Sequence, residues 1–62
     1  MNKNELMKKE IKRLVELVNC STGVDKEDYK RMVHSLMNEI LQKDWNLFDE
    51  CQLIIDQNYK GE

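Results

Sequence analysis

One segment, residues 29–41, limits what this chain can fold into more than any other. Its large apolar residues recur at spacings of three and four, which places them on one stripe of an α-helix. The members of this stripe are Tyr29, Met32, Val33, Leu36, Met37, Ile40 and Leu41. A helix with such a stripe must bury it, so the rest of the chain is expected to supply matching apolar surfaces.

The composition indicates that those surfaces also belong to helices. The 62 residues include no proline and only two glycines, and 35% of them are charged. Together with the helical spacing, this composition is typical of an all-α protein. The chain is long enough for one domain, so we expect a single helical domain over residues 1–62.

A first helix is predicted over residues 4–19. Asn4 is a candidate N-cap, and Glu5 follows it at a position where a carboxylate interacts favourably with the helix dipole. The inner stripe of this helix consists of Met7, Ile11, Leu14, Val15 and Val18.

The next break is predicted at residues 20–24, where Gly23 can adopt a left-handed backbone conformation. Asp25 is the candidate N-cap of a second helix over residues 26–42. Val24 and Tyr29 occupy the two positions of a hydrophobic staple. Because the connection is short, the first two helices are expected to be antiparallel neighbours.

Residues 42–46 allow two interpretations. In the first, Asp44 caps a third helix over residues 45–59, and the chain forms a small three-helix bundle. In the second, one long helix spans residues 26–58, and the resulting helical hairpin dimerises to cover it. Asp44 would then lie on the apolar stripe, where an unpaired carboxylate is costly. Trp45 would lie opposite the stripe, with a large apolar side chain in water. We therefore predict the bundle.

The third helix of the bundle has its own apolar stripe. Its predicted inward residues are Leu47, Phe48, Cys51, Ile54 and Ile55.

Charge is distributed unevenly along the chain. Residues 1–18 include five basic and three acidic residues, whereas residues 44–62 include five acidic residues and one basic residue. Opposite charges attract, so the two ends of the chain are expected to associate, within one molecule or between two copies.

Few residues offer site chemistry. Zinc sites use four ligands, usually with a short-spaced pair, and His34, Cys20 and Cys51 do not provide such a set. Cys51 is instead expected in the core. Asp49 and Glu50 are adjacent and would point about 100° apart on a helix, so they cannot act as a catalytic pair. We predict no metal site, no cofactor and no enzymatic activity.

A nucleic-acid-binding transcriptional regulator is the alternative function. A third helix reading DNA would bring its acidic residues close to the phosphates, which would repel it. These acidic residues are Asp44, Asp49, Glu50 and Asp56. The basic residues of the first helix alternate with glutamates, so nucleic acid is not the expected partner.

The favoured hypothesis is a non-enzymatic protein–protein interaction module that acts as a regulator, inhibitor or adaptor. In so short a chain, apolar burial barely exceeds the entropic cost of folding, so we expect a homodimer. Trp45, Phe48 and Tyr59 are the predicted contacts with a partner, because aromatic residues dominate interface energies. Leu53 is added, since it would be exposed together with Trp45 if the second helix were continuous.

The expected location is the cytoplasm. No apolar run reaches the length of a membrane span, and residues 1–5 lead into an amphipathic segment rather than a signal sequence. Cys20 and Cys51 show no pairing pattern, which fits a reducing compartment.

Overall fold

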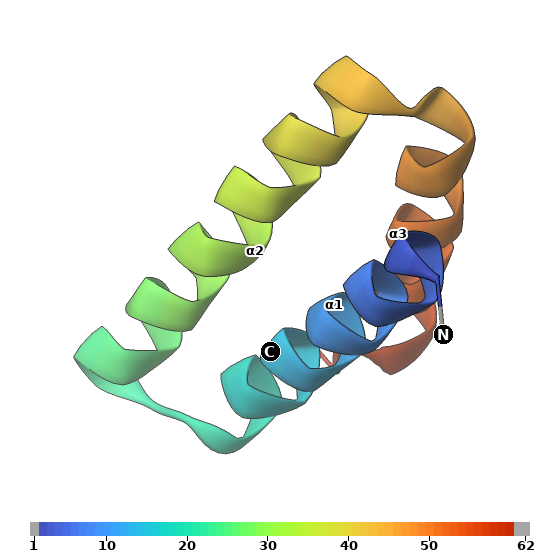
Figure 1. The fold of residues 1–62 in the computed structure, drawn as a ribbon. Coiled ribbons are helices and arrows are strands. Elements are labelled where there is room, and N and C mark those ends of the chain that lie inside the picture. The colour runs from blue at the N-terminus through green and yellow to red at the C-terminus, as the bar shows by residue number, and fades with distance from the viewer. Residues whose placement is uncertain (1, 61–62) are drawn as a thin grey trace.

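The computed structural model describes residues 2–60, which form three helices joined by short connections. The helices are α1 (Lys3–Cys20), α2 (Gly23–Lys43) and α3 (Trp45–Asn58). α1 and α2 are antiparallel, and α3 runs back alongside α1 (Figure 1). The described residues contain no strand. The predicted three-helix bundle is confirmed, and the alternative long helix over residues 26–58 is wrong.

The core lies where the three helices meet. Its residues have the spacing of three and four that one face of a helix requires. They are Ile11, Leu14, Val15 and Val18 of α1, Val33, Met37 and Ile40 of α2, and Leu47 and Cys51 of α3. The prediction that Cys51 is a core residue is confirmed.

The apolar stripe of α2 is narrower than predicted. Its central residues, Val33, Met37 and Ile40, are buried, whereas Met32 is 49% exposed. Met32 lies about 100° from Val33 around the helix axis, so it falls outside the face that contacts the other helices. The half-buried members are Tyr29, Leu36 and Leu41.

α1 begins earlier than predicted. Its N-cap is Asn2, whose side chain accepts a hydrogen bond of 2.9 Å from the backbone N–H of Glu5. The predicted cap, Asn4, lies inside the first turn. Asn2 and Asn4 are equally suited to capping, and starting at Asn2 adds backbone hydrogen bonds, including one from Leu6 to the carbonyl of Asn2.

α2 also begins earlier than predicted. Gly23 has the expected left-handed backbone, with φ of 62°, but it is the first residue of the helix. Thr22 occupies the N-cap position without a side-chain capping bond, and Asp25 lies within the first turn. Val24 is 76% exposed, so the predicted staple between Val24 and Tyr29 is wrong. The left-handed glycine makes the turn by itself.

Asp44 both ends α2 and begins α3. Its backbone N–H donates to the carbonyl of Ile40, and its side chain accepts from the N–H of Leu47 at 3.1 Å. The predicted cap is therefore confirmed. Trp45 nevertheless remains 73% exposed, so the break does not bury the tryptophan. The capping bond of Asp44 favours the break between α2 and α3. The expectation that this break keeps Trp45 out of water is wrong.

Candidate interaction surface

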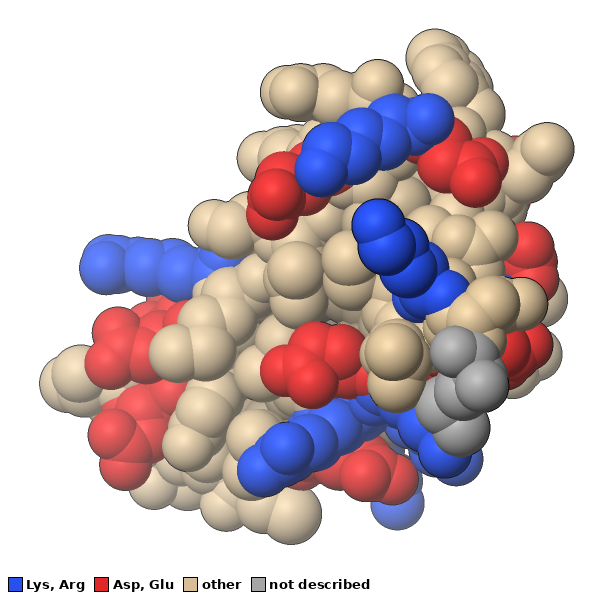
Figure 2. Space-filling view, viewed as in Figure 1, with Lys and Arg blue, Asp and Glu red and all other residues tan. Residues whose placement is uncertain are grey.

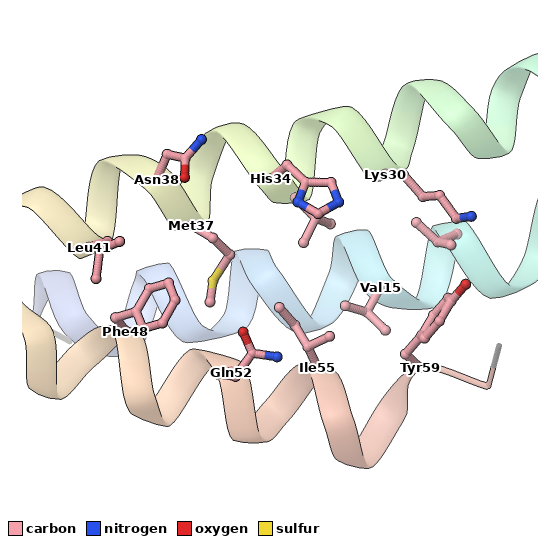
Figure 3. A pocket seen from close by; sticks show the side chains of 12 residues that line it. Val15, Lys30, His34, Met37, Asn38, Leu41, Phe48, Gln52, Ile55 and Tyr59 are labelled. Atoms are coloured by element: carbon pink, nitrogen blue, oxygen red, sulfur yellow. The ribbon is translucent and has the colours of Figure 1, made fainter.

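A groove of about 430 Å³ follows the seam between α2 and α3 (Figure 3). Side chains of all three helices line it, and its apolar lining includes Val15, Val33, Met37 and Ile55. Ligand sites in proteins commonly have this size and an apolar lining with a few polar groups.

The polar residues of the groove are spread along its length, and its charged residue, Lys30, lies near one end (Figure 3). Asn38, Leu41 and Phe48 lie towards one end. Lys30 of α2 and Tyr59, the residue after α3, lie at the other end (Figure 3). His34 lies on the α2 rim between these ends. No aspartate or glutamate is among the described lining residues, so the charge that the groove offers is positive.

Lys30 has one acidic neighbour on its own helix. Its Nζ lies 3.7 Å from a carboxylate oxygen of Glu27, and both side chains are substantially exposed. Exposed pairs of this kind contribute little to stability. Lys30 can therefore bind another anion at small cost.

The four predicted contact residues lie on two sides of α3. Phe48 is half-buried in the groove wall, and Tyr59, which is 37% exposed, lies at the end of the groove. Trp45 and Leu53 are outside the groove lining and are 73% and 57% exposed. On an α-helix Leu53 lies about 140° from Phe48, so one flat partner surface cannot contact all four residues.

Trp45 and Leu53 share their side of α3 with two carboxylates. Residues 45, 49, 53 and 56 fall within about 80° of one another around a helix. We call this set the outer α3 face, and it consists of Trp45, Asp49, Leu53 and Asp56, all exposed. It combines apolar side chains with negative charge.

A contact that the sequence did not predict fixes the end of α3 next to α1. The Nδ2 of Asn19 donates to the carbonyl of Asn58 at 2.8 Å, and its Oδ1 accepts from the backbone N–H of Lys60 at 3.0 Å. The two bonds are made by the residues before and after Tyr59, so they fix the backbone at the position where Tyr59 lines the groove. An asparagine near a helix end has many uses, so its partners cannot be deduced from the sequence.

One ion pair joins the oppositely charged ends of the chain. Lys8 of α1 contacts Glu50 of α3, and it also lies 4.0 Å from Glu5. The hydrogen bond with Glu50 is the main reason why the pKa of Lys8 is raised above its ordinary value. Attraction between the two ends thus operates within one molecule. Glu50 faces α1, which leaves Asp49 and Asp56 on the outer α3 face.

The cysteines and the histidine are not gathered in one site. Cys20 is exposed at the end of α1, Cys51 is buried in α3, and His34 is exposed on α2. Burial raises the pKa of the Cys51 thiol, which keeps it protonated and unreactive. Within residues 2–60, no three His, Cys, Asp or Glu side chains are grouped so that they could hold a metal ion.

Basic and acidic side chains alternate over the face of the molecule shown in Figure 2. Phosphate backbones bind to continuous basic surfaces, and this face offers none to nucleic acid. A stretch long and apolar enough to cross a membrane is absent from the helices of the described part of the chain.

Comparisons with protein-family models, with curated proteins and with solved structures find no match to this chain. The candidate function therefore depends on the two surfaces of α3. One is an apolar groove with positive charge on its rim, and the other is an apolar outer face with negative charge. Both are suited to binding.

Proposed function

We propose that this chain is a non-enzymatic protein–protein interaction module. In this proposal it forms homodimers, resides in the cytoplasm and acts as a regulator, inhibitor or adaptor. The observation that carries the proposal is the groove between α2 and α3, about 430 Å³ in volume, with Phe48 and Tyr59 in its lining. Apolar grooves between helices bind the apolar face of an amphipathic partner helix.

The charge of the groove defines the chemistry of this partner. Lys30 and His34 line the groove, and among residues 2–60 no aspartate or glutamate lines it. Complementary charge gives an interface its specificity and speeds association. The partner helix is expected to carry aspartate or glutamate beside its apolar residues.

Two further observations support the homodimer and the cytoplasmic location. Trp45 and Leu53 expose large apolar side chains on a chain of only 62 residues, and a second copy would cover such side chains. Cys20 and Cys51 are both free thiols, the usual state of cysteines in reducing compartments.

The test is affinity capture from the source cells with a matched pair of variants. His34→Glu adds a carboxylate to the groove, and Ser35→Glu adds one to the next residue, which is also exposed but does not line the groove. Binding in the groove predicts that a protein is retained by the wild-type chain and by Ser35→Glu and is lost with His34→Glu.

The capture result can also contradict the proposal. Equal retention by all three chains would mean that the groove is not the binding site. If the wild-type chain retained no protein at stoichiometric amounts, a role as an adaptor or inhibitor would be excluded.

A further inference from the structure

We infer that two copies of this chain pair through α3, with the outer α3 face of each copy filling the α2/α3 groove of the other. This inference rests on the proposed function, because it uses the same groove and identifies the surface of the proposed homodimer. Three independent features of the molecule lead to it.

The first feature is the distribution of apolar residues around α3. Leu47 and Cys51 face the core. Phe48 and Ile55 line the groove. Trp45 and Leu53 are exposed on the opposite side from the core. Large apolar side chains that share an exposed face commonly mark an interaction site. In one copy, α3 leaves Trp45 and Leu53 in water on its outer side, so this side fits a contact with a second copy.

The second feature is charge. Lys30 is the charged residue of the groove lining, and its neighbour Glu27, 3.7 Å away, lies outside the lining, whereas the outer α3 face presents Asp49 and Asp56. Pairing the two surfaces places opposite charges together around an apolar centre, as in protein interfaces with a polar rim. A groove packed against a second groove would instead bring two basic rims together.

The third feature is the position of the two surfaces on one helix. Phe48, in the groove wall, and Trp45, on the outer α3 face, are about 60° apart around the axis of α3. The surfaces are therefore neighbours. When α3 of a second copy enters the groove of the first, two-fold symmetry places α3 of the first copy in the groove of the second. Both grooves are then filled, so no further copy can bind and the assembly stops at a dimer.

This arrangement gives each of the four predicted contact residues a place in one interface. Phe48 and Tyr59 belong to the groove of one copy, and Trp45 and Leu53 belong to the face that fills it. A partner helix that occupies the groove must displace the second copy. Homodimer formation and partner binding are then mutually exclusive, so partner binding is regulated by the concentration of the chain.

The test uses sedimentation and the fluorescence of the single tryptophan, from micromolar to millimolar concentration. The wild-type chain is expected to change from monomer to dimer, and its emission is expected to shift to shorter wavelength over the same range. The reason is that Trp45, 73% exposed in one copy, becomes buried in the interface. A monomer throughout this range would overturn the inference.

A matched pair of variants locates the interface. Trp45→Ala is expected to raise the dimer dissociation constant about tenfold or more, as for central aromatic interface residues. Met32→Ala removes another exposed apolar side chain, 49% exposed on α2 and outside the groove lining, and is expected to leave the constant unchanged. A dimer that is insensitive to Trp45→Ala would also overturn the inference.

The failure of this inference and the failure of the proposed function are distinguishable. If the chain is monomeric but still retains a protein through the groove in the capture experiment, the proposed binding function stands and the self-pairing is excluded. If a dimer forms through Trp45 but no protein is captured, the self-pairing stands and the proposed binding of a partner protein is excluded.

Discussion

α1 and α3 pack against the same core, but their apolar residues are arranged differently. α1 has one buried stripe that includes Ile11 and Val15, and Leu6, near its start, is the one large apolar residue of α1 that is exposed. α3 buries Leu47 and Cys51 and also exposes Trp45. One molecule thus covers all but one of the large apolar side chains of α1, whereas it leaves two of those of α3, Trp45 and Leu53, exposed.

The largest expected effect comes from the buried stripe of α1. Ile11 has no exposed surface, and Ile11→Ala is expected to lower the free energy of unfolding by about 3 kcal/mol through lost burial and a cavity. Leu53→Ala, on the outer α3 face, is expected to cost under about 0.5 kcal/mol. Urea denaturation at low micromolar concentration measures both. Equal losses would contradict the difference between the two helices.

The caps of the two helices provide the next comparison. Asp44→Ala removes the capping bond to Leu47 and is expected to cost about 1 kcal/mol, because this bond is partly buried. Asn2→Ala removes the equivalent bond to Glu5 at an exposed helix end, and about 0.5 kcal/mol is expected. Far-UV circular dichroism during urea denaturation reports both values. An unchanged or increased stability of Asp44→Ala would show that the chain does not need the break.

A smaller effect is expected where α1 holds the end of α3. Asn19→Ala removes the bonds to Asn58 and Lys60, and a loss of about 0.5 kcal/mol is expected for the two together, because one bond is exposed and the other is only partly buried. The Lys60 amide is expected to exchange its hydrogen faster, since its acceptor is lost. Gln57→Ala, an exposed change near the same end, is the control and is expected to leave that exchange unchanged.

The smallest effect is expected from the ion pair between α1 and α3. Glu50 raises the pKa of Lys8, so the contribution of this pair is complete below the ordinary lysine pKa and is lost as the pH rises through the raised value. Between neutral pH and about pH 11, the free energy of unfolding is expected to fall slightly more for the wild-type chain than for Lys8→Met.

Two comparisons isolate the contribution of Lys8 at alkaline pH. Lys9→Met, at an exposed neighbour, is expected to follow the wild-type chain. The pKa of the Cys51 thiol is raised mainly by burial, and Lys8 acts on it in the opposite direction, so all three chains are compared with Cys51 replaced by alanine. An identical pH dependence of the wild-type chain and Lys8→Met would contradict a role for the pair.

Much of the fold was predictable because its signals are local. Helical spacing identified the helical segments, and the capping signal of Asp44 correctly divided residues 26–58 into two helices. The helix starts were less predictable, since Asn2 and Asn4 have the same capping chemistry. The width of a stripe was also not predictable, because Met32 follows the correct spacing and still falls outside the contact face.

The candidate site was predictable only in part. Aromatic residues of α3 were singled out as contacts, and Phe48 and Tyr59 line the groove whereas Trp45 and Leu53 do not. Each position around α3 follows from the sequence, but the side that meets α2 depends on how the helix is rotated in the bundle. That rotation results from the packing of residues distant in sequence.

The sequence by itself determined the helical class and the regions where the chain turns, and the cap at Asp44 favoured three helices over two, because periodicity, glycine geometry and capping act over a few residues. Only the tertiary structure decided that α2 and α3 leave an apolar groove between them and that Asn19 holds the chain beyond α3. Both features join residues far apart along the chain, and their contacts exist only once the three helices have packed together.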